Sequence, residues 1–490
     1  MRSLAFYFVL IAVPFTGVKA QIQVGGDIDG EAAGDWSGYS VSMPDRYTVA
    51  IGAPYNSGAG AYHGHVRVFK WNGSAWVQKG TDLDGEAYSD RSGYSVSMPD
   101  SNTVAIGEPL HDGNGNQSGR VRVFVWKGNS WVQKGAGIVG EHSYDKAGRA
   151  VCMPDSNTVA VATELNGDNG DNAGHVRIFT WNGSTWVQKG ADIDGEAAGD
   201  ESGFSISMPN ANTIAIGAPL NDGNGNNAGH VRVFEWTGTA WTQKGADIEG
   251  AVANDRFGYS VSMPTPDVFA AGAPFHDLYK GHVRVFSWNG SSWVQEGSDV
   301  DGDTYNNQLG WSVSMPSEDY FAAGAPIENV NDTMTGVGHV RVFTKHSNDW
   351  VQLGSNVVGE GSNDQSGWSI SMPDEQTCAI GAPYNDGNGV DAGHVRIYGG
   401  FYLVGIADDQ TESMVSVYPN PTNGMVNVSF ESNPDNAYIK VYSPSGKLIQ
   451  QHLNITTNVH QLEINQATGV YFVEVATAGE SRWFKVVLQR

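Results

Sequence analysis

The chain has few basic residues, and this shortage limits its partners. It has 490 residues, of which 28 are Lys or Arg and 53 are Asp or Glu, giving a formal net charge of −25. The phosphates of a nucleic acid would repel such a chain, so we expect no nucleic-acid partner. Acids and bases balance from Met414 onward, so the acidity belongs to the preceding part. Cation binding and plain solubility are the two remaining interpretations of this charge.

Long apolar runs are also missing after the first 20 residues, so we expect no transmembrane segment. Residues 1–20 predict a signal peptide, because Arg2 precedes an apolar run from Leu4 to Phe15. Small residues then lead to a predicted cleavage site between Ala20 and Gln21. We therefore expect an exported protein.

Signatures of catalysis are absent as well. The sequence contains no G-x-S-x-G, no H-E-x-x-H, no phosphate-binding P-loop and no dinucleotide-binding glycine pattern. We therefore expect that the protein is not an enzyme.

One repeated segment dominates what the sequence does contain. The segment SGYSVSMPD at Ser37–Asp45 recurs about every 55 residues, a period typical of one sheet per repeat. Its glycine falls at Gly38, Gly93, Gly148, Gly203, Gly258, Gly310 and Gly367. Each repeat reads as four strands with turn residues between them, so we predict an all-β, seven-bladed β-propeller over residues 21–401.

The two ends of the repeat region predict how the ring closes. Gln21–Gly30 aligns with Trp186–Gly195, which contains a fourth strand, whereas the seventh repeat ends at Gly400 without one. We therefore expect Ile22–Gly25 to complete the seventh blade and leave no open sheet edge at the seam.

The repeats resemble the FG-GAP family, which forms the propeller of integrin α-subunits. The resemblance is carried by Phe257–Pro264, by Gly272-Ala273-Pro274 and by the HVRVF segment that follows. The third repeat is the most degenerate, with AGRAVCMP and ATEL in place of SGYSVSMP and GAPL. The turn that carries calcium ligands in integrins is too short here to hold an ion, so those sites do not transfer.

The last part of the chain, residues 416–490, has its own motifs, which include Tyr418, Pro419, Asn420, Pro421, Gly424, Gly469, Tyr471 and Lys485. With these residues it resembles the C-terminal sorting domain of the type IX secretion system of Bacteroidetes. The resemblance implies a small Ig-like β-sandwich that engages the type IX machinery after a linker at residues 402–415. It also implies passage across the outer membrane of a Gram-negative bacterium, with the domain then removed or the protein attached to the surface.

Acidic residues recur in the loops between blades with the spacing D-x-D-x-E-x-x-x-D. The pattern covers Asp27, Asp29, Glu31 and Asp35; Asp82, Asp84, Glu86 and Asp90; and Asp192, Asp194, Glu196 and Asp200. Such oxygens could wrap Ca²⁺, although the glycine stands at position four and not at position six. The alternative is that these side chains cap turns and bridge neighbouring blades. The third repeat has Gly137 and Val139 in place of the leading acids.

Other polar features have both functional and structural interpretations. The loop after GAP, with Asp222, Asn224 and Asn226, is either part of a ligand-binding face or a flexible turn. Six repeats place a histidine before the third strand, where hydrogen bonding within the blade is the expected role. Those histidines are His65, His175, His230, His282, His339 and His394.

The tryptophans and cysteines have simpler interpretations. Eleven of the 15 tryptophans flank the last hairpin of a repeat, where paired aromatics stabilise the turn or else could stack on sugars. Cys152 and Cys378 lie in different repeats, so we expect buried free thiols and no disulfide.

Together these features predict an exported, non-enzymatic binding or adhesion protein with a monomeric propeller. One propeller face would contact a protein or glycan partner. The alternative is a polysaccharide-binding lectin or a glycan-acting enzyme on the same scaffold.

Overall fold

The computed structural model forms two compact units, Met1–Val404 and Gly405–Arg490. It describes residues 21–329, 335–401, 415–418, 422–430, 433–434, 437–443, 447–477 and 480–488. The predicted signal peptide, the predicted linker up to residue 414 and the segment 419–421 lie outside the described residues, as does the side chain of Lys485.

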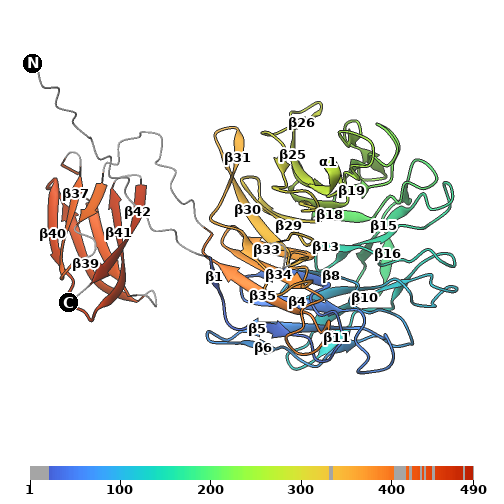
Figure 1. The fold of residues 1–490 in the computed structure, drawn as a ribbon, viewed down its shortest axis with the longest axis horizontal. Helices are drawn as coiled ribbons and strands as arrows, with labels where there is room; N and C mark the ends of the chain where they lie inside the picture. The colour runs from blue at the N-terminus through green and yellow to red at the C-terminus, as the bar shows by residue number, and fades with distance from the viewer. Residues whose placement is uncertain are drawn as a thin grey trace, which may run out of the picture. The chain divides into compact units, whose positions relative to one another are not determined.

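The first unit is a seven-bladed β-propeller, which confirms the predicted fold class (Figure 1). Each blade is an antiparallel sheet of four strands, with a further two-residue strand paired to the third strand. The innermost strands contact one another in a closed ring. In Figure 1, β13 and β18 lie near the middle of this unit, and β6 and β26 lie near its edge.

The blades are numbered in chain order. Blade 1 comprises β3 (Ser40–Asp45), β4 (Thr48–Ala53), β5 (His65–Trp71), β6 (Trp76–Gln78) and β7 (Leu83–Asp84). Blade 2 comprises β8 (Ser95–Asp100), β9 (Thr103–Glu108), β10 (Arg120–Trp126), β11 (Trp131–Gln133) and β12 (Ile138–Val139). Blade 3 comprises β13 (Val151–Asp155), β14 (Thr158–Thr163), β15 (His175–Trp181), β16 (Trp186–Gln188) and β17 (Ile193–Asp194). Blade 4 comprises β18 (Ser205–Asn210), β19 (Thr213–Ala218), β20 (His230–Trp236), β21 (Trp241–Gln243) and β22 (Ile248–Glu249).

The remaining blades follow the same plan. Blade 5 comprises β23 (Ser260–Thr265), β24 (Val268–Ala273), β25 (His282–Trp288), β26 (Trp293–Gln295) and β27 (Val300–Asp301), with a one-turn helix, α1 (His276–Tyr279), before β25. Blade 6 comprises β28 (Ser312–Ser317), β29 (Tyr320–Ala325), β30 (His339–His346), β31 (Asp349–Gln352) and β32 (Val357–Val358). Blade 7 comprises β33 (Ser369–Asp374), β34 (Thr377–Ala382), β35 (His394–Gly399), β1 (Ile22–Gln23) and β2 (Ile28–Asp29).

The first described strand joins blades 7 and 1. Strand β1 pairs antiparallel with β35, with Ile22 opposite Gly399 and Gln23 opposite Tyr398. The Val24 N–H donates to the carbonyl of Ile397 at 2.7 Å, and the Trp76 indole of blade 1 donates to the Val24 carbonyl at 2.8 Å. The fourth strand of the last blade is therefore the first strand of the propeller.

The two serines of the SVSM segment explain why this motif recurs. The Ser40 hydroxyl donates to the carbonyl of Gly93 in blade 2 at 2.8 Å, and the Ser42 hydroxyl accepts from the Met98 N–H at 3.0 Å. Equivalent bonds link the other blades, through Ser369 and Ser371 at the seam, but blade 3 has Ala150 and Cys152 in place of the two serines and keeps only the second contact. Each innermost strand is thereby fixed to the next without covalent closure.

The glycine of the GAP segment is required by the close approach of neighbouring blades. A Cβ atom on Gly52 would lie 2.1 Å from the Gly93 carbonyl oxygen of the next blade. Gly93 itself adopts a φ of +87°, which disfavours other residues. The recurring FG-type and GAP glycines therefore form one contact between two blades.

Cys152 occupies the position of the second serine in blade 3, where the Met208 N–H donates to its Sγ at 3.3 Å. Both cysteines are free.

We expect Cys152→Ser to keep the melting temperature within about 2 °C, because serine supplies the same acceptor. Cys152→Ala should lose about 1 kcal/mol, or roughly 2–4 °C, because the Met208 N–H loses its acceptor. Thermal melts of the two variants check this, and equal melting temperatures would contradict it.

The second unit contains two packed β-sheets. One sheet comprises β36 (Val415–Tyr418), β37 (Met425–Phe430) and β40 (Val459–Glu463). The other comprises β39 (Leu448–Ile455), β38 (Ala437–Tyr442), β41 (Gly469–Thr477) and β42 (Glu480–Leu488). Buried side chains from both sheets share one core, which includes Val426, Val428, Ile439 and Val473. In the part of the chain that the structure describes, no helix has the length and apolar character needed to cross a membrane.

Candidate functional site

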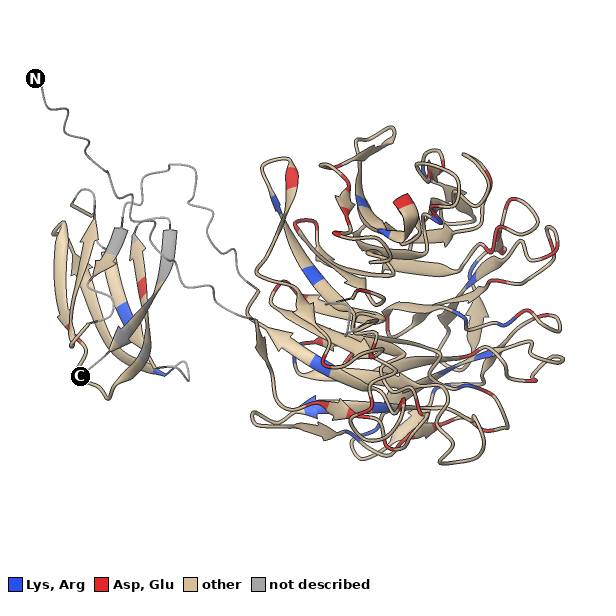
Figure 2. Cartoon of the chain, in the orientation of Figure 1, with Lys and Arg blue, Asp and Glu red and all other residues tan. Residues whose placement is uncertain are grey.

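One face of the propeller carries both variable loops of every blade, and we call it the loop face. It is formed by the interblade loops, such as residues 30–37, and by the post-GAP loops, such as residues 55–64. Both loop types meet at the end where the innermost strands begin. The acidic side chains of the propeller lie mainly in loops and not within strands (Figure 2).

The centre of the loop face opens into a cavity of about 520 Å³ around the propeller axis, which we call the central funnel and which has both apolar and polar lining residues. One residue from each blade lines its mouth, directly after the glycine of the repeated motif. These residues are Tyr39, Tyr94, Arg149, Phe204, Tyr259, Trp311 and Trp368. Two residues further along each strand, a second ring of Val and Ile lines the wall. Its members are Val41, Val96, Val151, Ile206, Val261, Val313 and Ile370.

The mouth of the central funnel is a closed ring of side-chain contacts. Five pairs of neighbouring aromatic rings have centroids between 4.7 and 5.5 Å apart. The guanidinium of Arg149 closes the remaining gap, 5.0 Å from the Tyr94 ring and 4.4 Å from the Phe204 ring. All seven side chains are half-buried, so the rings present part of their surface to the cavity.

Blade 3 supplies the only charged side chain of this ring, and this accounts for the degeneracy of its repeat. Arg149 stands where the other blades have an aromatic residue, and Glu164 stands where GAP has its proline. The two side chains form an ion pair at 3.0 Å, with Glu164 only 10% exposed. Burial lowers the pKa of Arg149, but the Glu164 carboxylate and the neighbouring tyrosines together outweigh burial and raise that pKa above its ordinary value.

Glu201 of the next interblade loop lies beside this pair. Burial, and then the charge of Glu164, raises the pKa of Glu201, while Arg149 lowers it. The backbone at Glu201 is left-handed, with φ of 53°, and Gln308 and Gln365 hold the equivalent positions in blades 6 and 7. A glutamine therefore fits the backbone of this site.

Glu201→Gln should stabilise the protein at neutral pH. When folding raises the pKa of a carboxyl, the ionised carboxyl destabilises the folded protein at pH values above that raised pKa. Below the pKa of the unfolded chain the carboxyl is protonated in both states, so it then has no effect on stability. We expect the melting temperature to rise by about 1–3 °C at pH 7.5 and by less at pH 4. Melts at both pH values check this; an unchanged or lower melting temperature at pH 7.5 would contradict it.

Further aromatic side chains extend the surface outward from the funnel mouth. Trp36 lies 4.0 Å from Tyr55 and 4.6 Å from Tyr384 between ring centroids. Of the six tyrosines that are more than a third exposed on the described propeller, five lie in loops of the loop face. Those five are Tyr62, Tyr88, Tyr144, Tyr279 and Tyr305. The strongly exposed tyrosines thus concentrate on this face.

The structure separates the four acids of each interblade pattern and does not bring them to one centre. The last acid caps its own loop, since Asp35 accepts from the Ala32 N–H at 2.9 Å and from the Asn56 amide at 3.0 Å. Asp200 makes the equivalent bonds, and Asp90 accepts from the Ala87 N–H and pairs with His111. The calcium ligand set stays a prediction, but this geometry agrees with the turn-capping alternative.

The other acids of the pattern divide between two blades. Asp27 and Asp29 lie with His394 of blade 7, whereas Glu31 lies with His65 and Asp82 of blade 1. Glu31 also approaches the guanidinium of Arg67 at 3.7 Å, as Glu196 approaches Arg232. Burial is the main reason that Asp84 and Asp194 have raised pKa values, whereas a hydrogen bond from Arg120 lowers the pKa of Glu86.

The post-GAP loop of blade 4 is exposed but internally bonded. Asp222 accepts from the Asn227 N–H at 2.8 Å, and the Asn224 amide donates to the Gly250 carbonyl at 2.8 Å. Asn226 is exposed, and its carbonyl accepts from the Asn254 N–H of the next interblade loop. The predicted ligand residues therefore lie on the loop face, outside the central funnel.

The six repeated histidines are almost completely buried at the start of their third strands. Burial, and then a neighbouring arginine in most blades, lowers the pKa of His65 to about 4, and five further histidines behave alike. At neutral pH these imidazoles are therefore uncharged. Several have no hydrogen-bond partner in their blade, so the predicted internal hydrogen bond is not general.

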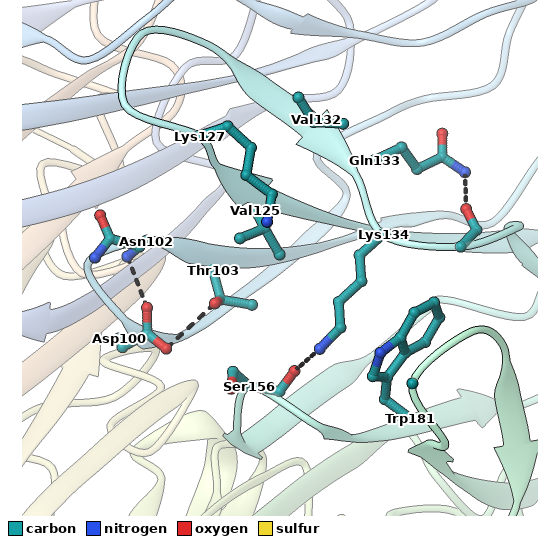
Figure 3. A pocket seen from close by; sticks show the side chains of 12 residues that line it. Asp100, Asn102, Thr103, Val125, Lys127, Val132, Gln133, Lys134, Ser156 and Trp181 are labelled. Carbon is teal, nitrogen blue, oxygen red and sulfur yellow. Dashed lines mark hydrogen bonds between the residues drawn. The ribbon is translucent and has the colours of Figure 1, made fainter.

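A second cavity, of about 600 Å³, lies at the turns opposite the loop face, between blades 2 and 3 (Figure 3). Lys134 Nζ donates to the Ser156 carbonyl at 2.5 Å and to Asn157, and Asp100 bonds within its own turn. Lys189 makes the same bonds in the next blade. Trp181 pairs with Trp186, as the hairpin interpretation predicts. This cavity belongs to the repeated scaffold.

The residues of the funnel mouth were not singled out from the sequence. The available signal is variation at one position, because the residue after each repeated glycine changes between Tyr, Arg, Phe and Trp while its neighbours repeat. Such variation inside a repeated motif indicates a position at which the propeller fold does not require a particular residue.

The fold and this site define a seven-bladed β-propeller with an aromatic funnel on its loop face. Residues 416–489 match the family described as "Secretion system C-terminal sorting domain", so this end of the chain is a type IX secretion sorting domain. The protein is therefore secreted across the outer membrane, to the cell surface or beyond. No curated protein matches the chain.

Solved structures share the propeller fold alone. The GH74 xyloglucanase of Xanthomonas campestris is 12% identical with a TM-score of 0.45, and the match covers 84% of this chain and 60% of that one. Sqt1 of Chaetomium thermophilum is 12% identical with a TM-score of 0.45, covering 78% and 100%. The propeller domain of the Trilobed protease of Pyrococcus furiosus is 8% identical with a TM-score of 0.41, covering 70% and 90%. The similar structures thus include enzymes and come at low identity.

Proposed function

We propose that this protein is an exported, non-enzymatic glycan-binding protein that takes a sugar unit of a glycan chain into the central funnel. The observation that supports this proposal is the ring of six aromatic side chains and one arginine at the funnel mouth. Ligand pockets are concave and mostly apolar, with a few polar groups that fix orientation. The apolar faces of a sugar ring suit the aromatic side chains, and its hydroxyls suit Arg149 and Glu164.

The surroundings of the funnel fit a ligand that extends over the loop face. Exposed tyrosines alternate there with Asn, Asp, Ser and Gly, a composition that supplies rigid contact area together with adaptable hydrogen bonding. The carboxylates accept hydrogen bonds from hydroxyls and repel anionic partners. We therefore favour a neutral or weakly charged glycan.

We further propose that the blades are FG-GAP-type repeats and that binding serves adhesion at the bacterial surface. The order of FG-like and GAP-like segments supports the first part. The sorting domain supports the second, because it brings the funnel to the outside of the cell.

Glycan hydrolysis is a second candidate function, favoured by one observation. Glu164 and Glu201 lie near each other and beside Arg149 of the funnel mouth, and the raised pKa of Glu201 is a property of catalytic acids. Glycosidases use two carboxyl groups on either side of the scissile bond. Release of new reducing ends from a bound glycan, abolished in Glu164→Gln and in Glu201→Gln, would support this function over simple binding.

A glycan array probed with the mature chain tests the main proposal. We expect binding to a family of related glycans, with the same glycans giving saturable isotherms in solution. Binding of protein ligands with no glycan binding would replace the proposal by protein adhesion. Glycan binding that persists when the funnel is blocked would move the site elsewhere on the surface.

A further inference from the structure

A second polar site lies in blade 3, away from the funnel mouth and beside the start of β15. Four side chains from separate segments meet there: Glu141, Asp168, His175 and Asp192. They come from an interblade loop, a post-GAP loop, the third strand and the loop after the fourth strand. One ligand atom from each lies within 4.8 Å of the other three, which is a separation that a single ion can bridge.

His175 is the buried member of this group. Its side chain is fully buried, and neither ring nitrogen has a hydrogen-bond partner. Its Nδ1 faces Asp192 Oδ2 at 3.8 Å, too far for a hydrogen bond. Buried polar atoms nearly always have a partner. His230, His282 and His394 are unpaired in other blades too, but the His175 imidazole lies among three carboxylates, and this combination points to a missing ligand.

The carboxylates keep free oxygens toward the cluster. Asp192 uses Oδ1 to accept from Gln188 at 2.6 Å, which leaves Oδ2 toward His175. Asp168 uses Oδ2 to accept from Asn166, and its Oδ1 faces His142 Nδ1 at 3.8 Å. The nearest cation is Arg177, 3.4 Å from Glu141, so one positive charge faces three carboxylates.

Two residues at or beside this cluster, Asp168 and His142, are particular to blade 3. Asp168 stands where four other repeats have glycine, namely Gly58, Gly113, Gly223 and Gly387. His142 stands where three other repeats have alanine, namely Ala32, Ala87 and Ala197. Neither residue is required by the propeller, because the other blades fold without it.

In blade 2 the equivalent location holds an arginine among its acidic residues. There Arg120 replaces the histidine, and its guanidinium contacts Glu86 at 2.6 Å and Glu108 at 2.5 Å. A positive charge of the protein itself thus lies among the acids of blade 2. In blade 3 the same location holds an imidazole and three carboxylates.

We propose that this cluster binds one divalent transition-metal ion of the Zn²⁺ class, through His175, Asp168, Asp192 and Glu141, with His142 as a further ligand. Mixed imidazole and carboxylate donors suit Zn²⁺ and related ions, whereas Ca²⁺ takes oxygen ligands. Since the ligands come from both sides of the blade 2–blade 3 boundary, the ion would join the two blades.

Equilibrium dialysis of the tag-free mature chain against Zn²⁺, with the bound metal measured by mass spectrometry, tests this site. We expect one tight equivalent, and Co²⁺ in its place should give visible absorption bands typical of nitrogen and oxygen ligands. Asp168→Gly and His142→Ala restore residues that other repeats use, so both variants should fold. Each should weaken Zn²⁺ binding at least tenfold, whereas Asp222→Asn in blade 4 should leave it unchanged.

The proposal would be overturned by no bound Zn²⁺, by tight binding that Asp168→Gly leaves intact, or by preference for Ca²⁺ over Zn²⁺ at the site. Several equivalents of equal affinity would also overturn it, because the site would then belong to every blade. Circular dichroism and thermal melts of Asp168→Gly confirm that any loss comes from the site and not from unfolding.

Discussion

Val24→Pro is expected to lower the melting temperature of the mature chain by roughly 5 °C or more. Val24 links the two ends of the ring, since its N–H donates to Ile397 in blade 7 and its carbonyl accepts from the Trp76 indole of blade 1. Proline removes that N–H and leaves the Ile397 carbonyl without its donor. The lost bond and the unpaired carbonyl together cost about 2–4 kcal/mol.

Gln23→Pro is the matched control for this prediction. Gln23 lies opposite Tyr398, and bonded pairs alternate with unbonded pairs along an antiparallel ladder. Because Val24 belongs to a bonded pair, the Gln23 N–H points away from β35, so proline there should cost far less. Thermal melts of both variants are the measurement. Equal melting temperatures for Val24→Pro and the parent chain would show that β1 does not hold the ring together.

Much of the architecture could be predicted because each blade solves the same packing problem. The alternation in SVSM, the buried run of TVAIGA and the turn residues between them recur with one period, so a local pattern read once applies seven times. The seam was predictable for a related reason. A fourth strand at the start and its absence at the end leave one pairing that closes the sheet.

The site was harder to predict because it depends on what seven distant positions do together. Tyr39 and Trp368 are 329 positions apart in sequence, yet their rings lie 5.5 Å apart at the funnel mouth. No local pattern shows that residues after the repeated glycine point to the axis. The acids could not be assigned to one centre from the sequence for the opposite reason, since carboxylates only two positions apart, such as Asp29 and Glu31, lie beside different blades.

Blade 3 illustrates how a degenerate repeat can carry the specific chemistry of a symmetric scaffold. Its departures from the repeat place Arg149 at the funnel mouth, with Glu164 paired to it, and place His142 and Asp168 at the cluster near β15. Seven identical blades would offer only a symmetric funnel, whereas an asymmetric ligand needs a polar group on one side. The substitutions that make the third repeat less similar to the others thus place one polar group on one side of the funnel.

Trp368→Ala is expected to weaken glycan binding at least tenfold, and by as much as a hundredfold for the best ligand. Trp368 contacts Trp311 at 4.9 Å, Tyr39 at 5.5 Å and Tyr384 at 5.8 Å between ring centroids, so it joins the funnel mouth to the outer aromatic cluster. Large aromatic side chains at the centre of a binding surface contribute about 2 kcal/mol or more each. Tenfold in affinity corresponds to about 1.4 kcal/mol.

Tyr47→Ala provides the control, because it also removes an exposed aromatic ring but lies in the β3–β4 turn, at the end of the blade opposite the loop face. Titration calorimetry of the parent chain and both variants with the strongest array ligand measures the difference. Circular dichroism shows whether Trp368→Ala stays folded, since the neighbouring rings lose a contact. A folded Trp368→Ala that binds the ligand as tightly as Tyr47→Ala would place the binding site outside the central funnel, because a ligand that contacts these rings must lose affinity when one of them is removed.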